Sequence, residues 1–112
     1  MSNHDFYHSR RWKKKREQIL RRDKHLCRES IRYGKHVDAT TVHHVFPLEE
    51  HPEWAFEDWN LISLCGEKHD AMHDRKAGKV TALGRQWQER VSPHPKSEEK
   101  EKPGTGEGSL FQ

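Results

Sequence analysis

The sequence predicts an α+β domain in which two short β-strands and a helix follow a basic N-terminal helix, with one more helix near the end. Three observations predict it: helical spacing of apolar residues near the N-terminus, two short β-rich stretches in the middle, and a second helical spacing beyond them. Of the 112 residues, 30% are hydrophobic and 35% are charged, so the core must be small. We expect a flexible N-terminus over residues 1–8, one domain over residues 9–91 and a disordered tail over residues 92–112.

The first expected helix covers residues 9–22. Ser9 can cap its first turn, and Trp12, Ile19 and Leu20 share one face. The other faces are almost purely basic. A solvated amphipathic helix accounts for this pattern, but so does a surface that binds the phosphates of nucleic acid. The residues expected to contact DNA are Arg10, Arg11, Lys13, Lys14, Arg21 and Arg22.

Two strands are expected in the middle of the chain. Residues 39–46 are rich in threonine and valine, and Pro47 closes this strand. Residues 48–58 then form a loop whose aromatic side chains we expect to fill part of the core. The second strand covers residues 61–64, and Gly66 ends it.

Helices are expected after the second strand. Residues 67–75 carry acidic side chains early and basic ones late, which complements a helix dipole. Val80, Leu83, Trp87 and Val91 have the spacing of a final amphipathic helix. The chemistry of the protein must therefore be built on strand, loop, strand and helix.

Charge is unevenly distributed along the chain. Residues 1–36 contain twelve basic and four acidic residues, whereas residues 37–76 contain three basic and nine acidic ones, together with all four of the site histidines discussed below. A basic segment attracts polyanions, and an acidic one tolerates cations. A basic segment followed by an acidic, histidine-containing one suggests a metal-dependent protein that binds nucleic acid. A heavily charged helical domain without such a function gives similar counts of charged residues by chance.

The sequence contains no candidate membrane span, because its longest apolar run is only three residues, Trp54 to Phe56. The basic residues near the N-terminus are not followed by an apolar segment of the signal-peptide kind. We therefore expect the protein in the cytoplasm.

Four of the ten histidines form a pattern. His69 and His73 are spaced i, i+4, which on a helix places both imidazoles within reach of one ion. His43 and His44 are neighbours on the first expected strand, so their side chains point to opposite sides and only one can join the other two. Three imidazoles with open coordination positions are typical of a catalytic metal site. Spacing alone leaves open the alternative that these four histidines are unrelated and form no site in a histidine-rich chain.

The segments Val42–Val45 and Asn60–Cys65, followed by His69 and His73, resemble the motif of the His-Asn-His (HNH) endonuclease family. The resemblance implies the ββα-metal (His-Me finger) fold. The His-x3-His ending is similar to that of the nuclease colicins. The N-terminal segment is similar to the small HNH proteins of tailed phages and prophages, whose genes commonly lie beside those of the DNA-packaging terminase. The resemblance extends from about Phe6 to Trp87.

This resemblance implies a role for each residue of the motif. His43, His69 and His73 match the metal ligands. His44 matches the general base that takes a proton from the attacking water, and Asn60 matches the residue whose amide holds the loop and hence the base. The implied activity is metal-dependent hydrolysis of DNA phosphodiester bonds, by nicking or double-strand cutting, leaving 5′-phosphate and 3′-hydroxyl ends. We expect one divalent ion per site, drawn from Mn²⁺, Ni²⁺, Co²⁺, Zn²⁺ and Mg²⁺.

The two cysteines depart from the family pattern. Many relatives carry two Cys-x-x-Cys pairs that hold a structural zinc ion, whereas here Cys27 is followed at that spacing by Ser30, and Cys65 by Lys68. A four-cysteine site within one chain is therefore impossible, and no structural zinc is expected. The two thiols can be neighbours, but a reducing cytoplasm argues against a disulfide.

Two other functions compete with the nuclease. One is a non-catalytic DNA-binding or packaging-accessory module with the same fold, against which the unligated His44 and the intact Asn60 argue. The other is a site-specific homing or restriction enzyme, for which the chain has no separate sequence-reading domain. DNA is the expected partner, with terminase or other packaging proteins beside it.

The C-terminal tail ends in two apolar residues, Leu110 and Phe111, after a long polar stretch. So small a patch needs no explanation. The alternative is a docking peptide, because Ser109 to Phe111 resembles the end of the short motif by which bacterial DNA-processing proteins bind the sliding clamp, with Glu107 in place of the leading glutamine.

Overall fold

A computed structural model describes residues 3–74 and 76–91. Its helices are α1 (Asn3–His8), α2 (Arg10–Arg22), α3 (Arg28–Ile31), α4 (Gly66–Asp70) and α5 (Ala82–Val91). Its strands are β1 (Thr41–His44), β2 (Leu61–Leu64), β3 (His73–Asp74) and β4 (Lys79–Val80), and two short 3₁₀ helices cover Pro52–Trp54 and Asp58–Asn60. None of the described helices has the length and apolar character needed to span a membrane. The α+β class with its paired strands followed by a helix is confirmed.

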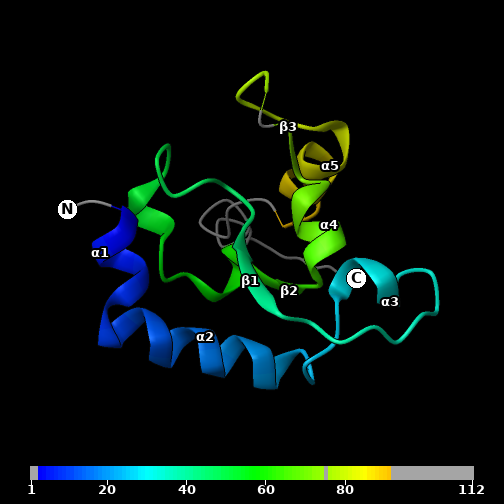
Figure 1. Ribbon diagram of the computed structural model, residues 1–112, viewed down its shortest axis with the longest axis horizontal. Coiled ribbons are helices and arrows are strands. Elements are labelled where there is room, and N and C mark those ends of the chain that lie inside the picture. The colour runs from blue at the N-terminus through cyan, green and yellow to red at the C-terminus, as the bar shows by residue number, and fades with distance from the viewer. Residues whose placement is uncertain (1–2, 75, 92–112) are drawn as a thin grey trace, which may run out of the picture.

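The centre of the molecule is the antiparallel pair β1–β2, in which His43 lies opposite Ile62 and His44 opposite Leu61. Figure 1 shows α2 on one side of this pair and α4, β3 and α5 on the other. Because successive side chains of a strand point to opposite faces, the pair separates two hydrophobic clusters. The first cluster takes Val42 of β1 and Leu61 of β2, and the second takes Ile62 and Leu64 of β2 with Val45, which follows β1.

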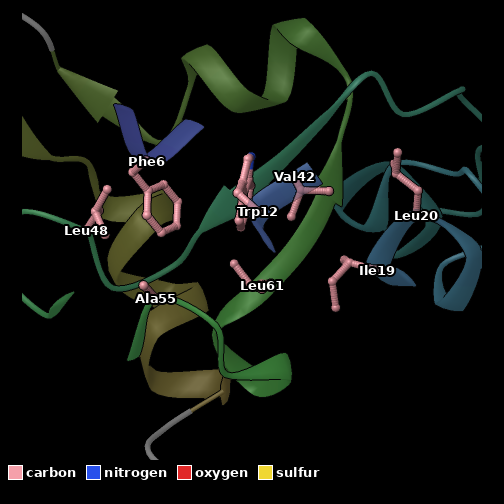
Figure 2. Close-up of a cluster of buried hydrophobic side chains, with 8 residues drawn as sticks. All are labelled: Phe6, Trp12, Ile19, Leu20, Val42, Leu48, Ala55 and Leu61. Atoms are coloured by element: carbon pink, nitrogen blue, oxygen red, sulfur yellow. The ribbon is translucent and has the colours of Figure 1, made fainter. Parts of the chain in front are cut away.

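The first cluster joins α1 and α2 to the sheet (Figure 2). Its eight buried members are Phe6, Trp12, Ile19, Leu20, Val42, Leu48, Ala55 and Leu61. The second cluster lies on the opposite face, under α4 and α5. Its seven buried members are Cys27, Val45, Ile62, Leu64, Cys65, Met72 and Trp87. The indole nitrogen of Trp87 donates a hydrogen bond of 2.9 Å to the buried carboxylate of Glu29, so this ring is satisfied as well as packed.

Helix α2 confirms the expected N-terminal helix. The Ser9 hydroxyl accepts a hydrogen bond of 3.1 Å from the backbone N–H of Trp12, and Trp12, Ile19 and Leu20 are its buried residues. The expectation of a flexible segment before it differs from the structure, because residues 3–8 form α1. Phe6 is only 7% exposed in the first cluster, and this burial orders the segment.

The expected helix over residues 67–75 is wrong in its second half, since α4 ends at Asp70 and His73 lies on β3. The chain turns so that Met72 becomes fully buried in the second cluster, and β3 then pairs with β4. Val80, expected in the final helix, belongs to β4 and lies opposite His73. Tertiary pairing and burial therefore override the local helical pattern. The expected disorder of residues 92–112, and the docking motif at Leu110 and Phe111, lie outside the described residues.

Candidate metal centre

A cavity of about 750 Å³ opens beside β1, and its walls include four histidines: His43, His44, His69 and His73. They come from three elements, because β1 contributes two, α4 one and β3 one. The structure thus brings together the four histidines singled out in the sequence. It does so through a strand, a short helix and a hairpin, whereas the i, i+4 spacing predicts one continuous helix for His69 and His73.

His43 lies between the other two candidate ligands. Its ring centroid is 5.2 Å from that of His69 and 5.4 Å from that of His73. Burial lowers the pKa of His43 well below its ordinary value, and the nearby His69 and His73 lower it further. The imidazole is therefore neutral near pH 7, which is the form that binds a metal ion.

As the side chains stand, no three His, Cys, Asp or Glu groups among residues 3–74 and 76–91 converge tightly enough to hold an ion. His69 and His73 are both half-buried and line the cavity, so their side chains have room to rotate. Closing a three-histidine shell requires that rotation around the central His43.

His44 points to the opposite side of β1, as strand alternation predicts. Its ring stacks on Trp12 with a centroid separation of 4.9 Å and an interplanar angle of 24°. Its Nε2 lies 3.0 Å from the carbonyl oxygen of Ala55. A carbonyl can only accept, so Nε2 carries the proton and Nδ1 is the basic nitrogen of the neutral ring. Burial lowers the pKa of His44, although the Ala55 carbonyl and the charge of Glu49 oppose the shift.

Asn60 is fully buried and ties the loop between β1 and β2 together. Its Oδ1 accepts a hydrogen bond of 2.7 Å from the backbone N–H of Phe46, and its Nδ2 donates to the carbonyls of Phe46 and Trp54, both at 3.2 Å. Trp54 immediately precedes Ala55, whose carbonyl orients His44. The amide of Asn60 therefore acts on the candidate base indirectly: it holds the backbone of Trp54, and the carbonyl of the next residue, Ala55, bonds His44.

The six basic residues predicted to contact DNA have different surroundings. Arg22 is engaged within the fold: it forms an ion pair with Asp23 at 2.8 Å and donates to the carbonyls of Asp58 and Leu61. The guanidinium of Arg11 lies 3.8 Å above the ring centroid of Phe56. The remaining four are exposed on α2, namely Arg10, Lys13, Lys14 and Arg21.

Sequence analysis missed two cations of the cavity, Lys79 on β4 and Arg85 on α5. Both depend on the β3–β4 hairpin, which was expected to be helical. Arg85 is the fourth residue of α5, whereas the helix expected from the sequence begins at Val80, so no local pattern singled it out.

The two cysteines are buried free thiols. Burial raises the pKa of the Cys27 thiol, but hydrogen bonds with Ser30 and Cys65 outweigh that effect and leave the pKa below its ordinary value. The thiols are therefore neighbours, as considered from the sequence, and they pack at the base of α3 and α4 within the second cluster.

Comparison with known proteins gives one match among solved structures. Searches of family models and of curated proteins find no match. The crystal structure of the HNH endonuclease of the deep-sea thermophilic bacteriophage GVE2, which was solved with a manganese ion, superposes with a TM-score of 0.59 at 34% sequence identity. The match covers 66% of this chain and 76% of that one. With this identity and coverage, the chain belongs to the HNH endonuclease family.

Proposed function

We propose that the protein is a metal-dependent endonuclease that hydrolyses phosphodiester bonds of DNA. One observation carries the proposal: adjacent histidines of β1 lie on opposite faces, so that His43 joins His69 and His73 while His44 stays separate, with an oriented ring. A protein that only binds DNA can use metal ligands to stabilise its fold, but it does not need a separate histidine that accepts protons. A separate histidine with a fixed tautomer suits proton transfer, which a hydrolase requires.

His43, His69 and His73 fit a divalent ion in type, and the separations of His69 and His73 from His43 are close to those of rings that share one ion. A metal–nitrogen bond of about 2.0–2.1 Å places the ring centroids of two imidazoles on one ion roughly 5 Å apart. The separations from His43 are 5.2 Å and 5.4 Å. When bound, the ion would offset charge on the phosphate and stabilise the departing oxygen.

The chain's own residues supply the remaining chemistry. Nδ1 of His44 takes the proton from the attacking water, while Nε2 donates to the Ala55 carbonyl and keeps the ring in one orientation. Asn60 holds the loop that presents this carbonyl. The products implied by the family resemblance carry 5′-phosphate and 3′-hydroxyl ends.

The test is cleavage of supercoiled plasmid across a panel of divalent ions. Neutral imidazoles favour borderline ions, so we expect activity with Mn²⁺, Ni²⁺ or Co²⁺ at least equal to that with Mg²⁺. His44→Ala should lower the cleavage rate by roughly 10²–10⁴-fold, because it removes the general base, and leave metal affinity nearly unchanged. His36→Ala, at an exposed histidine, is the matched control.

Cleavage by His44→Ala within a few-fold of wild type would remove the base assignment. Loss of metal binding in that variant would mean that the roles of His43 and His44 are exchanged. If the wild-type protein binds DNA but does not cut it with any of the ions tested, the protein is the non-catalytic packaging-accessory module instead.

The biological setting is a finer proposal. The phage origin of the matched endonuclease supports a phage or prophage gene. We propose in addition that the gene product acts in the host cytoplasm during DNA packaging. Co-purification with terminase subunits encoded by the same genome tests this setting. Failure to co-purify in the presence of DNA would leave the nuclease without a packaging role.

A further inference from the structure

The cavity has two cations that neither the metal nor the base accounts for, Lys79 and Arg85. The candidate ligands add no negative charge, but the carboxylates of Glu49, Glu50 and Asp74 also line the cavity and would repel a phosphate. A phosphodiester entering this space needs positively charged partners that offset those acids, one of which, Asp74, lies opposite Lys79 in the β3–β4 pair. The β4–α5 segment provides them.

Arg85 is fixed beside the candidate ligands. Its Nη1 donates a hydrogen bond of 2.9 Å to the carbonyl of Val80, and Val80 is the residue that pairs with His73 across the β3–β4 hairpin. A carbonyl accepts a hydrogen bond without neutralising the charge. The guanidinium therefore brings a full positive charge to the cavity, with further N–H donors in a planar fork.

The start of α5 is itself fastened to the segment between His69 and His73. The Thr81 hydroxyl donates to the carbonyl of Ala71 at 2.7 Å and accepts from the backbone N–H of Gly84 at 3.2 Å. The backbone N–H of Thr81 donates to the carbonyl of Met72 at 3.0 Å. Arg85 thus occupies a position that is set by the same segment as the candidate ligands, which is the preorganisation that charge stabilisation requires.

Arg85 has one structural contact, its hydrogen bond to the Val80 carbonyl, and that bond does not require a charged donor. It is the fourth residue of α5, near the helix end where positive charge is disfavoured, and it is exposed. An exposed arginine that lines the cavity is therefore suited to an anion that enters it.

We propose that Arg85 is a catalytic residue that binds a non-bridging oxygen of the phosphate being cleaved, with Lys79 as a second, less constrained cation. This inference rests on the proposed endonuclease function. The guanidinium orients the phosphate toward His44 and balances the charge that develops during attack; no proton leaves it.

The experiment compares Arg85→Ala and Arg85→Lys with Arg90→Ala, which makes the same charge change on the same helix outside the cavity lining. Single-turnover cleavage with Mn²⁺ should fall roughly 10²-fold in Arg85→Ala, because one preorganised donor group is lost. Arg85→Lys should recover part of the rate, since it keeps the charge and loses the fork. Arg90→Ala should stay within about threefold of wild type. Calorimetric Mn²⁺ affinity should be unchanged in all three.

A second readout separates this inference from the endonuclease assignment. Binding of a short DNA duplex to the metal-free protein needs no turnover, and Arg85→Ala should weaken it more than Arg90→Ala does. If wild type cleaves DNA but the two alanine variants behave alike in both assays, the Arg85 proposal is overturned and the nuclease assignment stands. If nothing cleaves DNA, the nuclease fails, and equal DNA binding by the two variants overturns the Arg85 proposal as well.

Discussion

The environment of His44 determines how it can act. Phe6 and Trp12 surround its ring, with centroids at 5.7 Å and 4.9 Å, and the side chain is only 5% exposed. Such surroundings disfavour the charged imidazolium, so the pKa falls below its ordinary value of 6.5. A base with a lowered pKa is a weaker base, but more of it is in the neutral, proton-accepting form at pH 7.

The pH dependence of cleavage should follow from this shift. His44 is active when neutral, so the rate rises as pH rises through its pKa and is level above it. Because the pKa is lowered, we expect the midpoint of the acid limb below pH 6.5, measured as single-turnover rate at saturating Mn²⁺. A midpoint at or above 6.5 would contradict burial as the dominant effect on the pKa of this ring. The pH–rate profile of His44→Ala should lack this acid limb.

At the scale of elements, α2 serves two purposes with two faces. Its buried face fills the first cluster, and its exposed face carries positive charge close to the candidate site: Lys13 lies with Tyr7 around a surface hollow, and Tyr7 also lines the histidine cavity. Helix α2 can therefore bind the backbone of a duplex whose scissile phosphate enters the cavity, which supplies affinity without reading sequence.

Reversing charge on α2 should weaken binding to unrelated DNA sequences by a similar factor. For Lys13→Glu with Lys14→Glu, the slope of log affinity against log salt should become shallower by about 2, because each lost phosphate contact contributes about 0.9. Lys24→Glu with Lys35→Glu makes the same charge change outside α2 and should change the slope less. Fluorescence anisotropy at several salt concentrations measures both. A changed cleavage sequence at constant affinity would instead make α2 a sequence reader.

Gly84 permits the close contact between α5 and the β3–β4 hairpin. A Cβ there would meet the Val80 side chain and lie 2.6 Å from the carbonyl oxygen of Met72. Gly84→Ala should therefore destabilise the fold by roughly 1–3 kcal/mol through overpacking, and it should lower metal affinity because His73 pairs with Val80. Gly66→Ala is the control, since nothing lies within 4 Å of its added methyl. Thermal unfolding and Mn²⁺ calorimetry compare them; equal stability of the two variants would contradict the packing argument.

Sequence patterns predicted α2, β1, β2 and the division of His43 from His44, because each depends on local periodicity. They did not predict the β3–β4 hairpin, which depends on the burial of Met72 and on Thr81 bonding back to Ala71 and Met72. His73 lies beside His43 although it is on β3 and not on the predicted helix, and its role as a metal ligand stays a prediction. Arg85 could not be placed without the hairpin.

At the scale of the whole molecule, stability rests on two small clusters that share one two-stranded sheet. The first depends on α1, whose Phe6 packs against Trp12, Phe56 and His44. The second depends on α5 through Trp87. Helix α1 therefore supports the face of the sheet that carries His44, and α5 supports the face that carries His43.

Removing the Phe6 ring should cost roughly 3–5 kcal/mol of unfolding free energy, as for other buried aromatic residues changed to alanine. Cleavage should fall as well, because His44 loses a wall of its enclosure. Urea unfolding of Phe6→Ala measures the first effect, with Tyr33→Ala, at a ring 67% exposed, as a control expected within about 0.5 kcal/mol of wild type. A small loss in Phe6→Ala would mean that α1 does not stabilise the core.

The alternation of side chains along β1 means that a change in strand register can abolish activity without replacing either histidine. A slip of one residue between β1 and β2 would turn His44 toward α4 and His43 toward Trp12, exchanging ligand and base without altering any side chain. A single-codon deletion within the strand could therefore silence the protein while the His-His pair stays in the gene. We therefore expect activity to depend on the position of this pair relative to the buried Val42 and Val45 as well as on the presence of the histidines.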